Sequence, residues 1–527
     1  MEPKMYCYQC QETAKNEACT IAGVCGKKPT LANNMDVLKN AIKEISKVVL
    51  EQGYKDQEAK EFVTHSLFKC ITNANFDEAV FTNEIAKANE IYERLTGKKD
   101  AFVLTEDSWK TIGTQNEENA DLRGLKEFVI TGLMGMAAYH QHAINLGFDD
   151  DSIHNFTVEM LAKLKDTKDM NELITMVDRT GEYGVKAMAL LDKAHNESLG
   201  SPEITEVKID AGTRPGILIS GHDMDDMEQL LEQSKDAGID IYTHSEMLPA
   251  HYYPKFKKYD HLYGNYGNAW WKQVEEFKTF NGPILFTTNC IVPFKETEEY
   301  GKRIYTTNDA GYPGCIHIKA DKDGKKDFSE IIEQAKQCQP PQAIEQGTIV
   351  GGFAHNQVVN LIDSVVENVK NGSIRKFFVM SGCDGRFPSR KYYTEFAEGL
   401  KDDTVILTSG CAKYRYNKLN LGDINGIPRV LDAGQCNDSY TWAVVAMKLK
   451  EIFEADTFED LPIQFNIAWY EQKAVIVLLA LMHLGFKNIK VGPTLPAFAT
   501  PALVDFLVAN YGLSTIGTLE ADLQAIG

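Results

Sequence analysis

The first 25 residues contain four cysteines within the stretch CYQCQETAKNEACTIAGVC. Cys7, Cys10, Cys19 and Cys25 are separated by two, eight and five residues. Four thiols this close together can surround one tetrahedral metal ion or one iron–sulfur cubane. Zinc sites usually pair their cysteines more closely than the last two are paired here. We therefore favour an iron–sulfur centre over zinc, and rank a pair of structural disulfides below both.

Four further cysteines share another context, because each closes a short apolar segment that reads as a buried strand. The segments PILFTTNC, KFFVMSGC, VILTSGC and RVLDAGQC end at Cys290, Cys383, Cys411 and Cys436. Ligands of open α/β sheets bind in the crevice beyond the carboxyl ends of the strands. One cysteine in such a place is most often a small buried hydrophobe. Four of them, each at the last strand residue or just past it, predict thiols that converge in one crevice.

Residues of other types follow predicted strands in the same way. His222 follows GILISG, Glu246 follows IDIYTHS, and the segment IAWYEQKAV carries Glu471 and Lys473 where a short strand turns into an apolar helix. Soft thiolates favour iron–sulfur chemistry, zinc or Cu(I), whereas carboxylates favour harder, oxygen-bound metals. The mixed set indicates a multinuclear iron site in which some iron binds oxygen and can open a position to a substrate.

The elements that must position these residues change in kind along the chain. From Leu31 to Gly200 the apolar residues recur with helical spacing, as in FDEAVFTNEIAKANEIYERLTG, whose final glycine is a stop signal. Near Glu206 the pattern becomes an alternation of apolar strands and helices, which is typical of parallel sheets covered on both faces. We expect a multidomain chain with an all-α N-terminal helical-bundle domain (residues 1–206) and two α/β domains with mainly parallel sheets (207–342 and 343–527).

Composition narrows the classes of partner. The 527 residues are 43% hydrophobic and 25% charged, which is ordinary for a globular protein, and the net charge is −20. An acidic surface repels phosphate backbones, so we expect no nucleic-acid partner and no membrane insertion. The longest apolar run, Ala474 to Phe486, is too short to cross a bilayer and predicts a buried helix. The N-terminal residues lack an apolar signal core, so a cytoplasmic location with reduced thiols is expected.

The remaining candidates for metal binding are weaker. Cys70 reads as a helix core residue, and Cys315 and Cys338 lie in turn-rich segments that end no apolar strand. His140 and His142 could share a metal only on an irregular backbone, because residues i and i+2 point apart on a helix.

The motifs around these residues resemble a known family over nearly the whole chain. They are SGHDMDDMEQLL, YTHSEMLPA, GNYGNAWW, TTNC, MSGCDGR, TSGCAKYRYNKLNLGDI, LDAGQCNDSY and WYEQKA, together with the N-terminal cysteine array. With them the chain resembles the hybrid-cluster proteins, also called prismane proteins or hydroxylamine reductases. The resemblance implies two Rossmann-like α/β domains related to carbon monoxide dehydrogenases.

The resemblance also implies two metal centres. A [4Fe-4S] cluster would bind Cys7, Cys10, Cys19 and Cys25. A hybrid [4Fe-2S-2O] cluster would lie at the domain interface, with Lys473 beside it and a persulfide on Cys383. Its ligands would be His222, Glu246, Cys290, Cys383, Cys411, Cys436 and Glu471.

The activity implied by the resemblance is the two-electron reduction of hydroxylamine to ammonia and water. An external electron-donor protein or reductase would supply the electrons. The candidate catalytic acids are Lys473, Glu246, Glu471 and His222. Reduction of nitric oxide, as protection against nitrosative stress, is the nearest alternative. A non-catalytic redox sensor or protein S-nitrosylation factor, a nickel carbon monoxide dehydrogenase and a zinc-stabilised structural protein are further alternatives.

Overall fold

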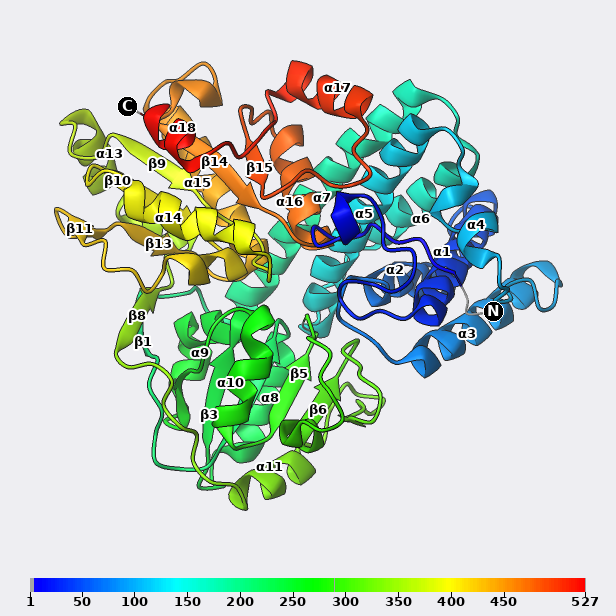
Figure 1. Ribbon diagram of the computed structural model, residues 1–527, viewed down its shortest axis with the longest axis horizontal. Coiled ribbons are helices and arrows are strands. Elements are labelled where there is room, and N and C mark those ends of the chain that lie inside the picture. The colour runs from blue at the N-terminus through cyan, green and yellow to red at the C-terminus, as the bar shows by residue number, and fades with distance from the viewer. Residues whose placement is uncertain (1–3, 289, 527) are drawn as a thin grey trace.

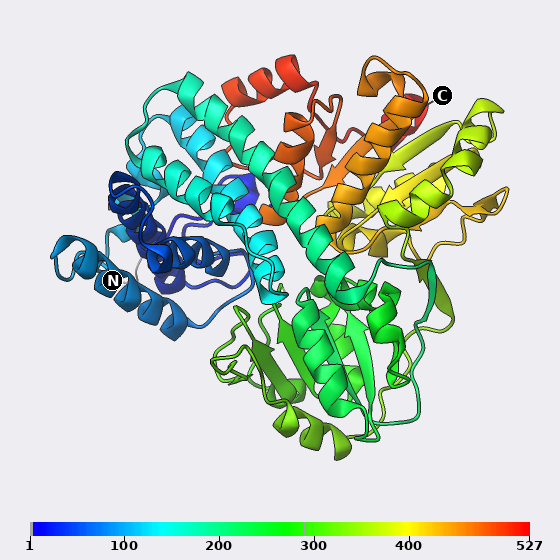
Figure 2. The same ribbon diagram turned by 180° about the vertical axis from the view of Figure 1, so that it is seen from behind.

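The protein, seen here as a computed structural model, is described over residues 4–288 and 290–526. A helical part lies against two α/β parts, each built on its own sheet (Figure 1; Figure 2 shows the reverse side). This arrangement confirms the predicted fold class of a helical N-terminal region plus two α/β regions with parallel sheets. The boundaries after residues 206 and 342 stay predictions.

Residues 31–200 fold into helices joined by loops, as the sequence predicts. In α3 the Asp77 side chain accepts a hydrogen bond from the Ala79 amide at the start, and Gly97 ends the helix at φ 76°. The buried residues Phe81, Ile85 and Tyr92 lie on its inner face. The helices of this part are α1 (Pro29–Glu51), α2 (Gln57–Lys69), α3 (Glu78–Thr96), α4 (Ser108–Thr111), α5 (Ala120–Asn145), α6 (Asp151–Asp166) and α7 (Met170–Leu199).

The first sheet is parallel throughout, in the order β4-β3-β2-β5-β6-β7. The chain order reverses between β2 and β5, which are neighbours although they are not consecutive. Such a switch point opens a crevice at the carboxyl ends of the two strands. The strands are β2 (Gly216–Gly221), β3 (Asp240–His244), β4 (Leu262–Asn265), β5 (Ile284–Thr287), β6 (Ile304–Thr307) and β7 (Ile316–His317); the helices are α8 (Met224–Ser234), α9 (Pro254–Lys257), α10 (Gln273–Phe280) and α11 (Ser329–Lys336).

The second sheet is also parallel, in the order β13-β10-β9-β14-β15-β16, and its order reverses between β9 and β14. Its strands are β9 (Lys376–Val379), β10 (Thr404–Thr408), β13 (Val430–Asp432), β14 (Ile463–Ala468), β15 (Lys490–Gly492) and β16 (Ser514–Thr515). Its helices are α12 (His355–Asn360), α13 (Ile362–Lys370), α14 (Lys391–Gly399), α15 (Ser439–Ile452), α16 (Gln472–His483), α17 (Pro501–Tyr511) and α18 (Leu519–Gln524).

Two short antiparallel ribbons complete the strands of the described chain. One joins the α/β parts, because β1 (Thr205–Lys208) precedes the first sheet and pairs with β8 (Thr348–Gly351), which precedes the second. The other pairs β11 (Asp423–Ile424) with β12 (Ile427–Pro428).

The apolar helix α16 joins the second sheet to the helical part. It packs against α5 and α7, where glycines let the backbones approach closely. A Cβ atom at Gly135 would lie 2.5 Å from the Gln472 carbonyl oxygen, and one at Gly181 would lie 2.3 Å from that of Leu479. The prediction of a buried helix in this stretch is confirmed. Within the described residues, no helix is both long and apolar enough to span a bilayer.

Candidate metal centres

Each predicted strand-end residue lies in a tight turn beyond its strand. The four cysteines come three or four residues after the last residue of β5, β9, β10 and β13, so each thiol lies past its strand rather than at the last strand residue. The intervening residues turn the chain with a positive φ just before the donor. These positions are Gly221, Ser245, Thr288, Gly382, Gly410 and Gly434.

Two of these turns are so close to a neighbouring strand that only glycine fits. A Cβ atom at Gly221 would lie 1.9 Å from the Thr287 carbonyl oxygen, across the switch point of the first sheet. One at Gly382 would lie 2.1 Å from the Ala468 carbonyl oxygen, across the switch point of the second. The close approach places the turns that carry His222, Cys290, Cys383 and Glu471 at the two switch points.

The turns of both sheets meet around one cavity of about 320 Å³. Every strand-end residue singled out in the sequence reaches this cavity, so the expected convergence is found. The ligand atoms of His222, Glu246 and Cys436 lie within 4.8 Å of one another. The lining residues are His222, Glu246, Trp270, Cys290, Gly382, Cys383, Cys411, Cys436, Tyr470, Glu471 and Lys473.

His222 presents the lone pair of its Nε2 atom to this cavity, where the Lys473 ammonium meets it at 2.8 Å. Its Nδ1 lies 2.6 Å from the Thr288 carbonyl oxygen, which can only accept, so Nδ1 carries the proton of the neutral ring. Burial and the nearby Lys473 ammonium hold the pKa of His222 well below its usual value. The imidazole therefore stays neutral, with Nε2 available as a metal ligand.

Glu246 has one carboxylate oxygen in use and one without a partner. Oε2 accepts the Cys436 amide at 2.9 Å and lies 3.8 Å from His222 Nε2. Oε1 is buried and has no hydrogen-bond partner. A buried, unpaired carboxylate oxygen costs free energy unless a cation or donor meets it. The donor set therefore fits a metal centre.

Glu471 and Lys473 enter the cavity from the N-terminus of α16. Glu471 Oε2 caps the helix by accepting the Lys473 amide at 3.0 Å, while Oε1 lies 3.8 Å from Cys383 Sγ. The Lys473 ammonium lies 2.8 Å from His222 Nε2 and 4.0 Å from Glu471 Oε1. Burial lowers the pKa of Lys473, but the negative groups around it, Glu471 foremost, outweigh burial and raise it.

The four thiols of the cavity carry little charge in the absence of a cation. Burial, with the Glu471 carboxylate, raises the pKa of Cys383 to about 12. Burial likewise raises the pKa of Cys290, Cys411 and Cys436 well above the usual value of a thiol. Metal binding deprotonates a coordinating thiol, so these cysteines would become thiolates only together with a cation.

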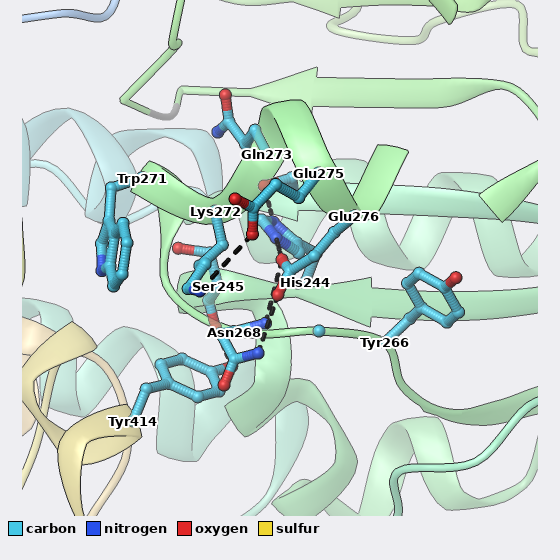
Figure 3. A network of polar contacts seen from close by, with 12 residues as sticks. His244, Ser245, Tyr266, Asn268, Trp271, Lys272, Gln273, Glu275, Glu276 and Tyr414 are labelled. Carbon is cyan, nitrogen blue, oxygen red and sulfur yellow. Dashed lines mark hydrogen bonds and ion pairs between the residues drawn. The ribbon is translucent and has the colours of Figure 1, made fainter. Parts of the chain in front are cut away.

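A polar network braces the strained turn that carries Glu246 (Figure 3). His244 Nε2 lies 3.0 Å from Glu276 Oε2, and Glu276 Oε1 accepts the Asn268 side-chain amide at 2.7 Å. The Tyr414 hydroxyl donates to the Ser245 carbonyl oxygen at 2.8 Å. These contacts hold Ser245 at φ 57° and so fix the direction of the next side chain.

The N-terminal cysteines form a second group. Cys7 and Cys19 face each other in a two-bond backbone bridge, with N···O distances of 3.1 and 2.8 Å. Cys10, Cys19 and Cys25 are buried and Cys7 is partly exposed. Burial raises the pKa of Cys10, and the charges of Cys25 and Cys7 raise it further, which reflects thiols held close together. The buried Lys27 ammonium lies 3.7 Å from Cys7 Sγ.

The two cysteine groups are joined by short polar contacts. The Gln11 amide, next to Cys10, donates to the Tyr470 carbonyl oxygen at 2.9 Å, and Tyr470 directly precedes Glu471. Arg390 is fully buried and donates both to Gln11 Oε1 at 2.9 Å and to the Cys383 carbonyl oxygen at 3.2 Å. One peptide and one guanidinium therefore connect the two candidate centres.

Sequence reasoning missed several residues that complete the cavity. Trp270 and Tyr470 line it, with ring centroids 4.7 Å apart. Gln435 donates to the backbone oxygens of His222 and Glu246, at 2.9 Å each, and thereby joins two turns of the first sheet to one of the second. Tyr470 and Gln435 each directly precede a predicted ligand in the sequence, and this position was the one indication that they belong to the cavity.

Comparisons with known proteins agree with this geometry. The model of the Prismane/CO dehydrogenase family matches residues 5–524. Proteins named hydroxylamine reductase from Acetivibrio thermocellus (56% identical, 99% of each chain covered), Porphyromonas gingivalis (56%, 100% of each) and Methanocaldococcus jannaschii (53%, 99% of this chain and 100% of the relative) are similar over their full length.

Two solved structures share the fold at low identity. Carbon monoxide dehydrogenase from Thermococcus sp. AM4 aligns at TM-score 0.58 and 14% identity, covering 98% of this chain and 90% of the other. The alpha subunit of an acetyl-CoA synthase/carbon monoxide dehydrogenase aligns at 0.59 and 16%, covering 98% and 86%. The resemblance seen in the motifs is confirmed: the chain belongs to the Prismane/CO dehydrogenase family.

Proposed function

We propose that this protein is a hydroxylamine reductase, which converts NH2OH, two electrons and two protons into NH3 and H2O. The observation that carries the proposal is the cavity in which four thiols, one imidazole, two carboxylates and one ammonium meet. Relatives named hydroxylamine reductase, 53–56% identical over the whole chain, support it.

Two iron–sulfur centres suit the donors. The four N-terminal cysteines would hold a [4Fe-4S] cluster. The hybrid [4Fe-2S-2O] cluster would use His222, Glu246, Cys290, Cys383, Cys411, Cys436 and Glu471. Thiolates suit iron bridged by sulfur and carboxylates suit iron bridged by oxygen, and the unpartnered Glu246 Oε1 supports this assignment. When bound, these groups would supply electrons and an iron with an open coordination position. Cys383 would carry a persulfide, which mass spectrometry of the peptide that contains it would detect.

Lys473 is the best candidate for the general acid. Cleavage of the N–O bond needs a proton on the leaving oxygen, because water leaves more readily than hydroxide. Lys473 keeps its proton at neutral pH because the neighbouring negative groups raise its pKa. A positioned acid contributes about two to four decades of rate. His222, Glu246 and Glu471 are weaker candidates, because a group bound to a metal is a poor acid until that bond loosens.

The cavity itself selects for small substrates. The rings of Trp270 and Tyr470 form part of its wall. Hydroxylamine has only two heavy atoms, which suits a site enclosed by these rings and by the metal-binding side chains. The rings also limit the entry of bulk water, which strengthens the electrostatic effect of Lys473.

Electrons would enter near Cys7, the most exposed cysteine of its group. Beside it lies a polar cavity of about 700 Å³ whose wall carries six cationic and three anionic side chains. It adjoins the small cavity behind Cys7, because Asp36, Lys39 and Thr114 line both. Lys39 pairs with Asp36, and Lys126 and Lys168 pair with Glu117, so the wall keeps a smaller excess of positive charge, which suits an acidic donor protein. The cationic residues are Lys39, Lys43, Arg123, Lys126, Lys165 and Lys168.

The decisive experiment is anaerobic purification followed by iron analysis, EPR spectroscopy and hydroxylamine turnover with reduced methyl viologen. One cubane and one four-iron hybrid cluster require about eight irons per chain. Glu471→Gln should abolish turnover and the hybrid signal while the cubane signal persists. Glu275→Gln, in an exposed carboxylate outside the cavity, is the matched control and should change neither.

Three results would overturn the proposal in different ways. A far larger kcat/KM for nitric oxide than for hydroxylamine would make the protein a nitric oxide reductase. Loaded protein that turns over neither substrate would indicate a redox sensor or S-nitrosylation factor. Simultaneous loss of both EPR signals in Glu471→Gln would contradict the assignment of two separate sites.

A further inference from the structure

A second cluster of metal-ligating side chains lies in the helical part, outside the two centres described above. His140, near the end of α5, and His154, in the first turns of α6, are both buried, and Asp149 lies in the loop between these helices. His140 Nε2 lies 2.9 Å from Asp149 Oδ1, and His154 Nε2 lies 3.1 Å from the same oxygen. His142, two residues after His140, stacks on His222 at 5.8 Å, so the two histidines serve different places, as their helical spacing predicts.

The hydrogen bonds around His154 show which of its nitrogens carries the proton. The Thr64 hydroxyl donates its only hydrogen to the Lys60 carbonyl oxygen at 3.1 Å. His154 Nδ1 lies 2.9 Å from the same hydroxyl and must therefore be the donor. In a neutral ring the lone pair then lies on Nε2, and it faces the Asp149 carboxylate oxygen.

Two lone pairs at 3.1 Å repel each other unless a cation or a proton lies between them. The rings of His140 and His154 lie with their centroids 4.6 Å apart, so both imidazoles face the same carboxylate. His140 Nε2, 2.9 Å from Asp149 Oδ1, also lies 3.3 Å from the Asp150 amide. Three ligand atoms from two helices and their loop thus converge on one point.

We infer that His140, Asp149 and His154 bind one divalent transition-metal ion, with Zn²⁺ as the best-suited occupant. The three ligand atoms lie within 4.8 Å of one another, and two imidazoles with one carboxylate form a typical zinc ligand set. Thr64 orients His154 as an outer partner does in known zinc sites. Asp149 is 44% exposed, which gives the ion a route from solvent and leaves a position for water.

The test is zinc uptake by the anaerobically purified, iron-loaded protein. After exposure to Zn²⁺ and desalting, about one zinc per chain is expected in the wild type and almost none in Asp149→Asn or His154→Gln, with unchanged iron, because each variant loses one of only three protein ligands. Thr64→Val, which keeps all three ligands, should weaken zinc binding about tenfold. His483→Gln removes a histidine paired with Asp178 elsewhere and is the control.

X-ray absorption at the zinc edge separates this site from zinc in a cysteine site. The expected spectrum shows nitrogen and oxygen neighbours at about 2.0–2.1 Å and no sulfur at about 2.3 Å. If His154→Gln fails to fold, Asp149→Asn in the exposed loop still decides the question. Equal zinc uptake by wild type and Asp149→Asn, no uptake by the wild type, or a sulfur shell around the bound zinc would each overturn the inference.

Discussion

Replacing Gly382 with alanine should damage the cavity at its narrowest backbone contact. Gly382 has φ 115°, and its added Cβ atom would lie 2.1 Å from the Ala468 carbonyl oxygen at the end of β14. The adjacent hydrogen bonds run from the Cys383 amide to that same oxygen, at 2.7 Å, and from the Ala468 amide to the Ser381 oxygen, at 2.9 Å. Relief of the clash must separate β9 from β14 and shift Cys383 away from Glu471.

The magnitude follows from these contacts. A positive φ costs an L-residue roughly 1–2 kcal/mol. Each of the two weakened hydrogen bonds adds about 1 kcal/mol. With the residual overlap, the expected loss of stability is about 3–5 kcal/mol. For a cooperative unit of this size, 1 kcal/mol corresponds to about 2–4 °C, so the unfolding midpoint of the second sheet should fall by about 10 °C.

Gly372→Ala is the matched control. Gly372 also has a positive φ, of 80°, but its Cβ atom would meet nothing within 4 Å. It should lose only about 1–2 kcal/mol, or about 4 °C. Anaerobic thermal unfolding by circular dichroism, with EPR of the hybrid centre, compares the two variants. Equal midpoints, or an intact hybrid signal in Gly382→Ala, would refute the view that this backbone contact positions the cysteine.

Three further changes test the electrostatics and the contacts between the centres. Burial raises the pKa of Glu117, but hydrogen bonds from two lysines outweigh it and hold the pKa at about 2. Since this lies below the unfolded value of about 4.5, the stabilisation should be present above about pH 4.5 and be lost as the pH falls through about 2. Urea unfolding of Glu117→Gln should show a deficit of about 2 kcal/mol at pH 7 that has mostly disappeared at pH 2. Tyr470→Phe loses a 2.6 Å hydrogen bond to Asn73 but keeps its carbonyl contact, so stability should fall by about 1 kcal/mol with both EPR signals retained. Arg390→Gln should cost about 3–5 kcal/mol and perturb both signals, whereas the exposed Lys391→Gln should leave the stability unchanged in the same denaturation assay.

The residues of the cavity could be predicted from the sequence because they are potential metal ligands that follow apolar, strand-like segments. Apolar segments that end near Cys383 or Cys411 mark parallel strands, and the carboxyl ends of such strands meet at one edge. The last residue of each strand could not be predicted as accurately. The turn at Gly382 places residues between the end of β9 and the Cys383 thiol. This turn depends on contact with the neighbouring strand β14, and hydrophobic periodicity carries no information about such contacts.

The packing of α16 was beyond sequence reasoning. Glycines inside a helical pattern indicate lower helix stability. Only the structure shows that Gly135 and Gly181 allow another helix to pack closely against their own helices. The partners that orient ligands, such as Gln435 on His222, also come from distant segments. The sequence analysis of His140 was incomplete for the same reason. Its spacing from His142 shows that the two side chains point apart, but it does not predict that Asp149 lies beside His140.

The groove that α5 and α7 offer to α16 has a consequence for how the molecule is made. In the sequence, the helices that form this groove and all strands of the first sheet come before α16, so the helix that fills the groove is synthesised after them. Glu471 and Lys473 reach the other donors only when α16 docks. Assembly of the large centre must therefore follow synthesis, and a chain that stops before α16 leaves apolar helix faces open to aggregation or proteolysis.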